Sequence, residues 1–161
     1  MPFDATAGAA TANSYASVAE ADAYLAVRGD TSTWTALTLG QKESKLQWAA
    51  LYLDTLTFKG TRSTSTQALQ WPRVGVVDRD GYTVASDGIP QALKNAQAEM
   101  AFQLIANDWT QGLGPVTNET LSVGSISLGR ETHRAFPAPV LALLRPFLAS
   151  VPGASGRLVR G

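Results

Sequence analysis

Apolar residues recur at helical spacing in three stretches of the sequence, and capping signals mark the start of two of them. Ser17 with Glu20, and Thr38 with Gln41, form capping boxes, in which each side chain satisfies a backbone N–H of the other residue. The spacing predicts three helices, over about residues 17–29, 38–57 and 90–110. We expect a mainly α protein, a helical bundle with a small β-hairpin and an extended C-terminal arm.

The third helix has no capping box, and its start is predicted from other signals. Ser86, Asp87 or Gly88 would cap it, and Pro90 suits its first turn, where a missing N–H is harmless. On all three helices the apolar residues fall mainly on one face. We predict that the core is formed by these inward positions: Ala21, Tyr24, Leu25, Leu39, Leu46, Ala49, Ala50, Leu53, Leu93, Ala96, Met100, Ala101, Leu104 and Ile105.

The segment between the second and third helices, residues 67–90, holds the densest turn signals of the chain. The proline in Trp71-Pro72 keeps the tryptophan out of the helical region. Asp80-Gly81 favours a tight turn with positive φ, and valines stand on both sides of it. The sequence therefore predicts a small β-hairpin at about 74–85.

Both ends of the chain are predicted to be extended. Residues 1–16 are small and polar and form an N-terminal arm, and residues 17–115 form the helical domain. Residues 116–161 form a C-terminal extended segment with weak strands, a short apolar helix at about 140–148 and a glycine-rich tail. Leu158-Val159 in this tail is suited to adding as a strand to the sheet edge of another chain.

The charge balance argues against a dedicated DNA-binding protein. The chain has 161 residues, 13 basic and 13 acidic side chains and no cysteine, whereas DNA affinity comes mainly from basic residues that neutralise phosphates. Residues 1–110 hold eight basic and eleven acidic side chains, and residues 111–161 hold five and two, so the C-terminal region is basic.

The length of the chain predicts one domain. We expect no leader and no membrane span, because no apolar run approaches about 18 residues.

Residues for catalysis, metal binding or cofactor binding do not form a recognisable set. His133 is the only histidine, and the chain has no glycine-rich phosphate loop. Asp78, Asp80 and Gly81 resemble part of a calcium loop, but Ile89 stands where such a loop needs its terminal Glu. We therefore predict a protein that is not an enzyme and that has no metal and no cofactor.

Three tryptophans, Trp34, Trp71 and Trp109, leave two interpretations open. Such rings stack on bases in single-strand binders, but that mode also needs a basic groove beside them. Only a few arginines lie near Trp71 in the sequence. A role in the core or in a subunit contact is the favoured interpretation.

Three sequence blocks together resemble one family. Asn13-Ser14-Tyr15 matches its opening signature, and Trp71-Pro72-Arg73 followed by Asp78-Arg79-Asp80-Gly81 matches its central run. Ile89-Pro90 opens the third block. The family is that of tailed-phage head-to-tail connector or adaptor proteins, often labelled DnaT-like domains, and the resemblance covers about residues 13–110.

The resemblance implies a virion structural protein at the neck, where head and tail join, which is in the host cytoplasm before assembly. It implies a homo-oligomeric ring of twelve copies beneath the portal protein, next to a tail-side connector or tail terminator protein. Double-stranded DNA would pass through its channel without sequence-specific binding. The residues predicted to contact a neighbouring subunit or the portal lie in the hairpin region and the tail: Trp71, Arg73, Asp78, Arg79, Asp80, Tyr82, Arg157, Leu158, Val159 and Arg160.

The DnaT-like label supports an alternative function, a single-stranded-DNA-binding replication accessory. That function predicts salt-sensitive oligonucleotide binding and quenching of tryptophan fluorescence. The neutral composition favours the adaptor instead, because many phosphate contacts repeated around a ring would hold DNA rather than let it pass.

Overall fold

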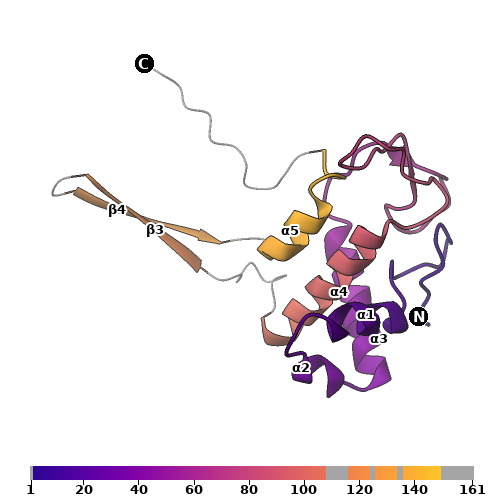
Figure 1. Cartoon of the computed structure of the whole chain (residues 1–161), viewed down its shortest axis with the longest axis horizontal. Coiled ribbons are helices and arrows are strands. Elements are labelled where there is room, and N and C mark those ends of the chain that lie inside the picture. Colours follow the sequence, from indigo (N-terminus) through magenta and orange to yellow (C-terminus); the bar gives the residue numbers. More distant parts are fainter. Residues whose placement is uncertain (1, 108–115, 124–125, 134–135, 150–161) are drawn as a thin grey trace.

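The computed structural model describes residues 2–107, 116–123, 126–133 and 136–149, with only the backbone described between 116 and 133. Over these residues the chain forms helices and short strands, which confirms the mainly α fold with a small β component (Figure 1). In chain order the elements are α1 (Val18–Ala26), α2 (Ser32–Thr35), α3 (Leu39–Leu53), β1 (Thr61–Arg62), β2 (Arg73–Val74), α4 (Gln91–Ala106), β3 (Val116–Val123), β4 (Ile126–His133) and α5 (Ala138–Leu144).

Helix α4 is the centre of the helical body. It contacts α1, α2, α3 and α5, so most of the core forms around it. Five of its predicted inward residues are buried, namely Leu93, Ala96, Met100, Ala101 and Leu104. Two polar side chains of the same helix, Gln97 and Glu99, are also buried. The apolar spacing therefore located the core face of α4 but not its polar contacts.

The capping signals are confirmed for two helices. Ser17 with Glu20, and Thr38 with Gln41, form complete capping boxes at the starts of α1 and α3. The predicted cap of α4 is wrong, because Pro90 itself occupies the N-cap position and no side chain caps the helix. The inward assignment of Leu39 is also wrong: it stands in the first turn of α3, before the helix meets α4, and is 64% exposed.

The predicted hairpin at about 74–85 is reduced to a turn with one isolated bridge between Val77 and Thr83. The regular pairing uses other residues, because β2 lies antiparallel to β1. The Arg73 side chain explains this pairing, since it donates to the carbonyl oxygens of Lys59 and Gly60 at 2.7 Å each. These bonds draw β2 toward the segment before β1.

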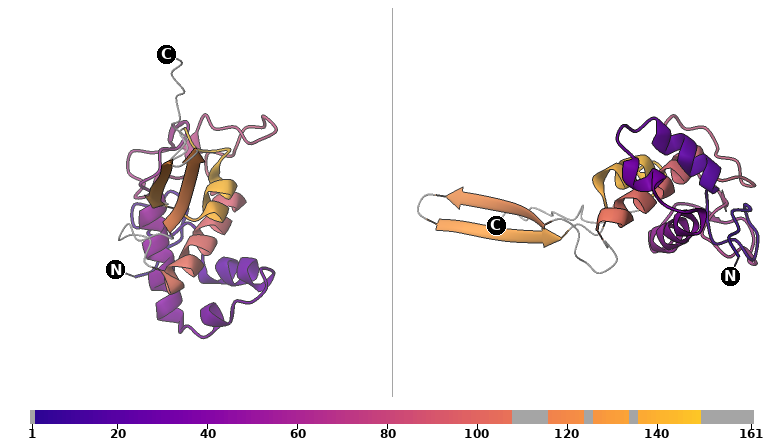
Figure 2. Two further views of the ribbon diagram at one scale, coloured as in Figure 1. Left: turned by 90° about the vertical axis from the view of Figure 1, so that its left-hand side faces the viewer. Right: turned by 90° about the horizontal axis from the view of Figure 1, so that it is seen from below.

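Strands β3 and β4 form a separate antiparallel ribbon, with Val116 opposite His133 and Val123 opposite Ile126. The expectation of weak strands in this region is confirmed. Figures 1 and 2 show the ribbon, hereafter the β3–β4 arm, projecting from the helical body on the side away from the N-terminal segment. The arm is inserted between α4 and α5 in the chain, and those two helices contact each other.

The C-terminal helix α5 is shorter than predicted and ends before Pro146, which cannot donate to a helical carbonyl. The residues after it pair with the segment that follows α3. The amide of Lys59 donates to Phe147 O, and the amide of Ala149 donates to Thr57 O, each at 2.9 Å. These bonds hold the end of the described chain against the C-terminal end of α3.

Candidate interaction surface

The Asn13-Ser14-Tyr15 block is held inside the subunit by a fully buried amide on α4. Gln97 Oε1 accepts from the backbone amides of Tyr15 at 2.9 Å and Ala16 at 2.7 Å. Gln97 Nε2 donates to Ser14 Oγ at 2.8 Å and to Leu46 O at 2.7 Å. One side chain thus joins the N-terminal segment, α3 and α4. The N-terminal arm is therefore anchored at its end.

A partly buried carboxylate, Asp54, forms a second internal junction. Its Oδ1 accepts from the Tyr15 hydroxyl, and its Oδ2 accepts from the Gln70 amide at 3.1 Å. Burial raises the pKa of Asp54 to about 6, although these hydrogen bonds and the charge of Arg73 act in the opposite direction. Burial and the nearby Asp54 charge raise the pKa of Tyr15. The junction is structural, because it ties the N-terminal segment to the loop before β2.

Two residues predicted to contact partners, Trp71 and Arg73, lie inside the subunit. The Trp71 ring is 1% exposed and packs edge-on against Phe58 and Phe147. Arg73 is also buried, and its guanidinium donates hydrogen bonds to backbone carbonyl oxygens, including Gln70 O at 3.1 Å. Both side chains therefore stabilise the loop that presents the neighbouring residues.

The other four predicted residues of the central run lie in the loop over residues 76–84, hereafter the 76–84 loop. Asp78 Oδ1 accepts from the backbone amides of Asp80 and Tyr82, each at 2.9 Å, so this carboxylate shapes the turn. Arg79 and Asp80 are exposed, and Tyr82 is 73% exposed beside the exposed Val77. The structure thus presents an aromatic ring and an aliphatic side chain on either side of a hydrogen-bonded turn. Arg157, Leu158, Val159 and Arg160 lie outside the described residues.

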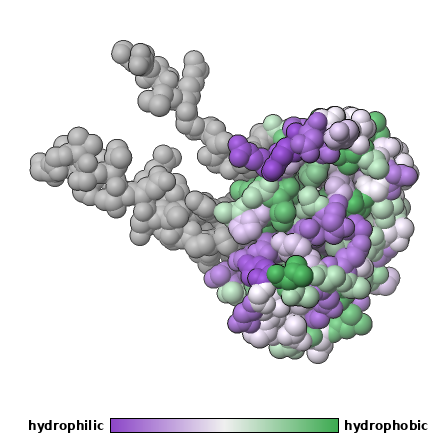
Figure 3. Space-filling model, in the orientation of Figure 1, coloured by the Kyte–Doolittle hydropathy of each residue, from purple (hydrophilic) through white to green (hydrophobic). Residues whose placement is uncertain are grey.

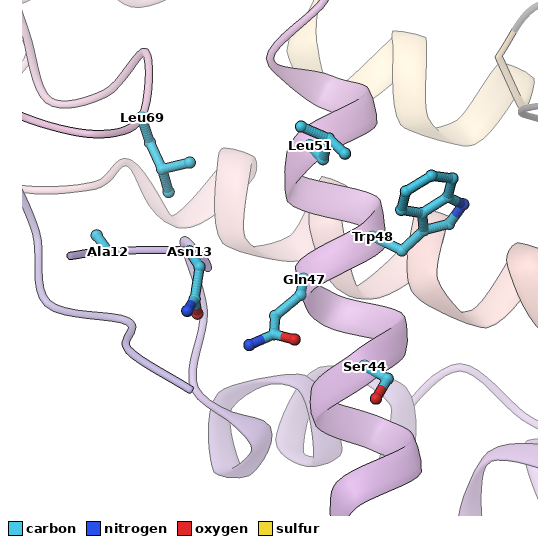
Figure 4. A pocket seen from close by; sticks show the side chains of 7 residues that line it. All are labelled: Ala12, Asn13, Ser44, Gln47, Trp48, Leu51 and Leu69. Atoms are coloured by element: carbon cyan, nitrogen blue, oxygen red, sulfur yellow. The ribbon is translucent and has the colours of Figure 1, made fainter. Parts of the chain in front are cut away.

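A groove that was not predicted lies along the outer face of α3 and is hereafter called the α3 groove. It has a volume of about 380 Å³ and is lined by Ala12, Asn13, Ser44, Gln47, Trp48, Leu51 and Leu69. Figure 4 shows Gln47 pointing toward Asn13, with the Trp48 ring on the other side of the helix. Trp48 is 45% exposed and Leu51 59% exposed. Two large apolar side chains therefore stand in solvent beside a concave surface.

A sequence signal for the α3 groove did exist. Trp48 and Leu51 are three residues apart, so they share one side of the helix, and neither belongs to the inward stripe. Apolar pairs outside the core stripe mark an interaction face more often than single exposed residues do. On the face shown in Figure 3, by contrast, hydrophilic and hydrophobic residues are interspersed.

Most basic side chains of the described residues are already engaged inside the subunit. Arg28, Lys42 and Lys94 form ion pairs with Glu99, Asp22 and Glu20. Lys45, Lys59, Arg62 and Arg73 donate to backbone carbonyl oxygens. Phosphate binding needs free cations. The described surface offers few of them, because most are already bonded within the subunit.

Two further properties concern the described ranges alone. They contain no group of three or more His, Cys, Asp or Glu side chains placed to hold a metal ion. None of their helices combines the length and the apolar character of a membrane span. Trp34 and Trp71 are buried, so neither ring is free to stack on a base, and Trp109 lies outside these ranges.

The fold and its surfaces define a small helical protein with an anchored N-terminal segment, a projecting two-stranded arm and exposed apolar side chains. The chain belongs to the family described as "Putative DnaT-like ssDNA binding protein", whose model matches residues 1–161. A search of curated proteins and a search of solved structures each gave no match.

Proposed function

We propose that the chain is a non-enzymatic virion subunit, the head-to-tail adaptor, which forms a ring between portal and tail around the DNA channel. The β3–β4 arm is the observation that carries this proposal. The strands of the arm have only each other as described sheet partners, and the arm projects from the body (Figure 2). A lone two-stranded ribbon is marginally stable in water. Its free edges suit pairing or packing against a neighbouring subunit.

The charge distribution supports the same function. The whole chain is neutral, and the described cations are largely paired within the subunit. A ring of such subunits would let double-stranded DNA slide, because a repeated set of phosphate contacts would hold it. The 76–84 loop, with its exposed Tyr82, and the basic C-terminal tail are the surfaces that we assign to the portal, to neighbouring copies and to the tail-side protein.

The experiment that tests the adaptor replaces residues 108–135 with a Gly/Ser linker. We expect the variant to keep its thermal unfolding transition, since the body retains α4 and α5, but to lose ring formation on the portal in negative-stain images. Substitution of Tyr82 by Ser is the companion variant and is expected to weaken ring formation without changing stability. Rings of unchanged frequency in the linker variant would remove the arm, and with it the main support for the adaptor.

The tail is tested separately. Deletion of residues 153–161 removes Arg157 and Arg160 and no residue of the described core. We expect a folded protein that docks more weakly to the portal in a pull-down assay. Unchanged docking would exclude the tail from the contact with the portal. It would not bear on the arm, which the linker variant tests.

The family description favours a second candidate, single-stranded-DNA binding in replication. In the described residues, Trp48 is the tryptophan with an exposed ring that such binding could use. An oligonucleotide titration at low salt, followed by tryptophan fluorescence, tests this candidate. Salt-sensitive quenching that disappears in Trp48→Phe would support it, and a flat titration would exclude it.

A further inference from the structure

We propose that the α3 groove binds the C-terminal tail of the same chain, with Leu158 and Val159 against Trp48 and Leu51. The tail comprises residues 150–161, which lie outside the described residues. The contact concerns the isolated subunit and does not depend on the adaptor function. In the isolated subunit, before any partner binds, the tail would cover the exposed apolar side chains of the groove.

The tail is attached close enough to reach the groove. The amide of Ala149, the last described residue, donates to Thr57 O at 2.9 Å. Thr57 follows Leu51 by six residues and therefore lies within about 20 Å of it even along a fully extended chain. The nine residues from Ala149 to Leu158 can span about 30 Å. The part of the groove from Ser44 to Leu51 occupies only about 10 Å along the helix axis.

The groove is uncharged and mainly apolar, and two acidic residues lie near it. None of its lining residues is charged. Asp4 adjoins the wall, because its backbone exchanges hydrogen bonds with Asn13. The Asp4 carboxylate accepts from Thr6 and Thr11, neither of which is a cation. Glu43 stands one helical turn before Gln47, and in the part of the chain with described side chains it forms no ion pair.

The tail has the complementary pattern. Leu158 and Val159 are adjacent apolar residues, and Arg157 and Arg160 flank them directly. Residues 150–161 contain no acidic side chain. An apolar pair flanked by two cations is complementary to an uncharged, mainly apolar groove with two carboxylates nearby. Because the tail is tethered, its effective concentration at the groove is of the order of 1 mM, so a weak contact is sufficient for occupancy.

Trp48 reports on this contact. The test compares the full chain with a chain truncated after Ala149, by Trp48 emission and acrylamide quenching. Trp48→Phe versions of both chains supply the background from the other three tryptophans. We expect truncation to shift Trp48 emission to the red and to increase its quenching. A synthetic peptide of residues 150–161, added to the truncated chain at millimolar concentration, should reverse both changes.

Point variants and dilution distinguish the possible occupants. Leu158→Ser/Val159→Ser in the full chain should reproduce the effect of truncation, whereas Ala154→Ser, the matched control, should not. Circular dichroism melting checks that each variant is folded. Protection of Trp48 that persists on dilution supports the tail of the same chain. Protection lost on dilution would assign the groove to a second copy, and identical Trp48 emission in all variants would leave the tail outside the groove; either result overturns the proposal.

Discussion

Gly60 occupies a position that only glycine fills without strain. Its φ is +68°, and an added Cβ would overlap Val74 O and lie 2.9 Å from Val76 Cγ2. Gly60→Ala should lower the free energy of unfolding by about 2–3 kcal/mol, because both the backbone angle and the contact with β2 become unfavourable. Urea denaturation measures this change.

Gly40 provides the matched control for that substitution. It lies in α3, and an added Cβ would meet nothing within 4 Å. Gly40→Ala should raise the free energy of unfolding by about 0.4–1 kcal/mol, because alanine loses less chain entropy in a helix. If the two substitutions changed the free energy of unfolding by the same amount in the same direction, or if neither changed it, the conformational role of Gly60 would be contradicted.

Asp54 should make stability depend on pH. Burial raises its folded pKa from 3.8 to about 6. A raised pKa means that this group contributes stability fully below about pH 3.8 and loses that contribution as the pH rises through about 6. The loss should reach about 3 kcal/mol. In Asp54→Asn, the fall in unfolding free energy between about pH 3 and 7 should be smaller by this amount.

A pH series of urea denaturation curves for both proteins measures the difference. Asp87→Asn, at an exposed loop position, is the matched control and should keep the pH profile of the original chain. A profile that does not change in Asp54→Asn would show that the carboxyl ionises in the folded state as easily as in the unfolded state.

Sequence reasoning located apolar positions better than buried polar ones. Leu46 and Leu93 follow helical spacing and are buried as expected. Gln97 is polar, and its burial depends on partners about 80 positions earlier in the chain. Trp71 was open to two interpretations because its neighbours Phe58 and Phe147 come from distant segments. The pattern of neighbouring residues in the sequence does not reveal partners that lie so far away along the chain.

At the scale of helices, an ion pair links the residues just after α1 to a buried carboxylate of α4. Arg28 forms two bonds to Glu99, at 2.7 and 2.8 Å, and the Glu99 side chain is 2% exposed. Arg28→Met should lower the free energy of unfolding by about 2–3 kcal/mol, because it leaves a buried carboxylate without its cation. The expected cost is at the low end for a buried pair, since Arg28 is partly exposed.

The double variant Arg28→Met/Glu99→Met separates pairing from burial. It should be more stable than Arg28→Met alone, because the unpaired charge is gone. Lys42→Met, which breaks an ion pair with the more exposed Asp22, should cost at most about 1 kcal/mol. Thermal unfolding of the four proteins at one pH provides the comparison.

Capping explains why helix starts were predictable while strand pairing was not. The signals for α1 and α3 lie within four consecutive residues, so the sequence displays them directly. The β1–β2 pair depends on Arg73 contacts with residues 58–60, and the 76–84 loop retains only one bridge. The predicted residues Arg79, Asp80 and Tyr82 of this loop are exposed, and their role as a contact surface stays a prediction. The α3 groove as a whole could not be predicted, because the fold brings Leu69 and Asn13 beside α3.

For the whole molecule, the C-terminal helix should be essential to folding and the tail dispensable. Phe136, Val140, Leu144, Phe147 and Leu148 are all buried. Truncation before Phe136 would lose about 10 kcal/mol of apolar burial, comparable to the total stability of a typical domain. We expect that protein to be unfolded by circular dichroism, whereas truncation after Ala149 should leave the melting transition intact.

The position of the β3–β4 arm between α4 and α5 has a mechanical consequence. A tension applied to the arm enters the body through two covalent connections, one at the end of the central helix and one at the start of the final helix. Those helices pack on each other, so both of them carry the load within the core. A load on a single terminal segment would instead detach that segment from the body. A load on the arm would therefore reach the core of the helical body and not the N-terminal segment.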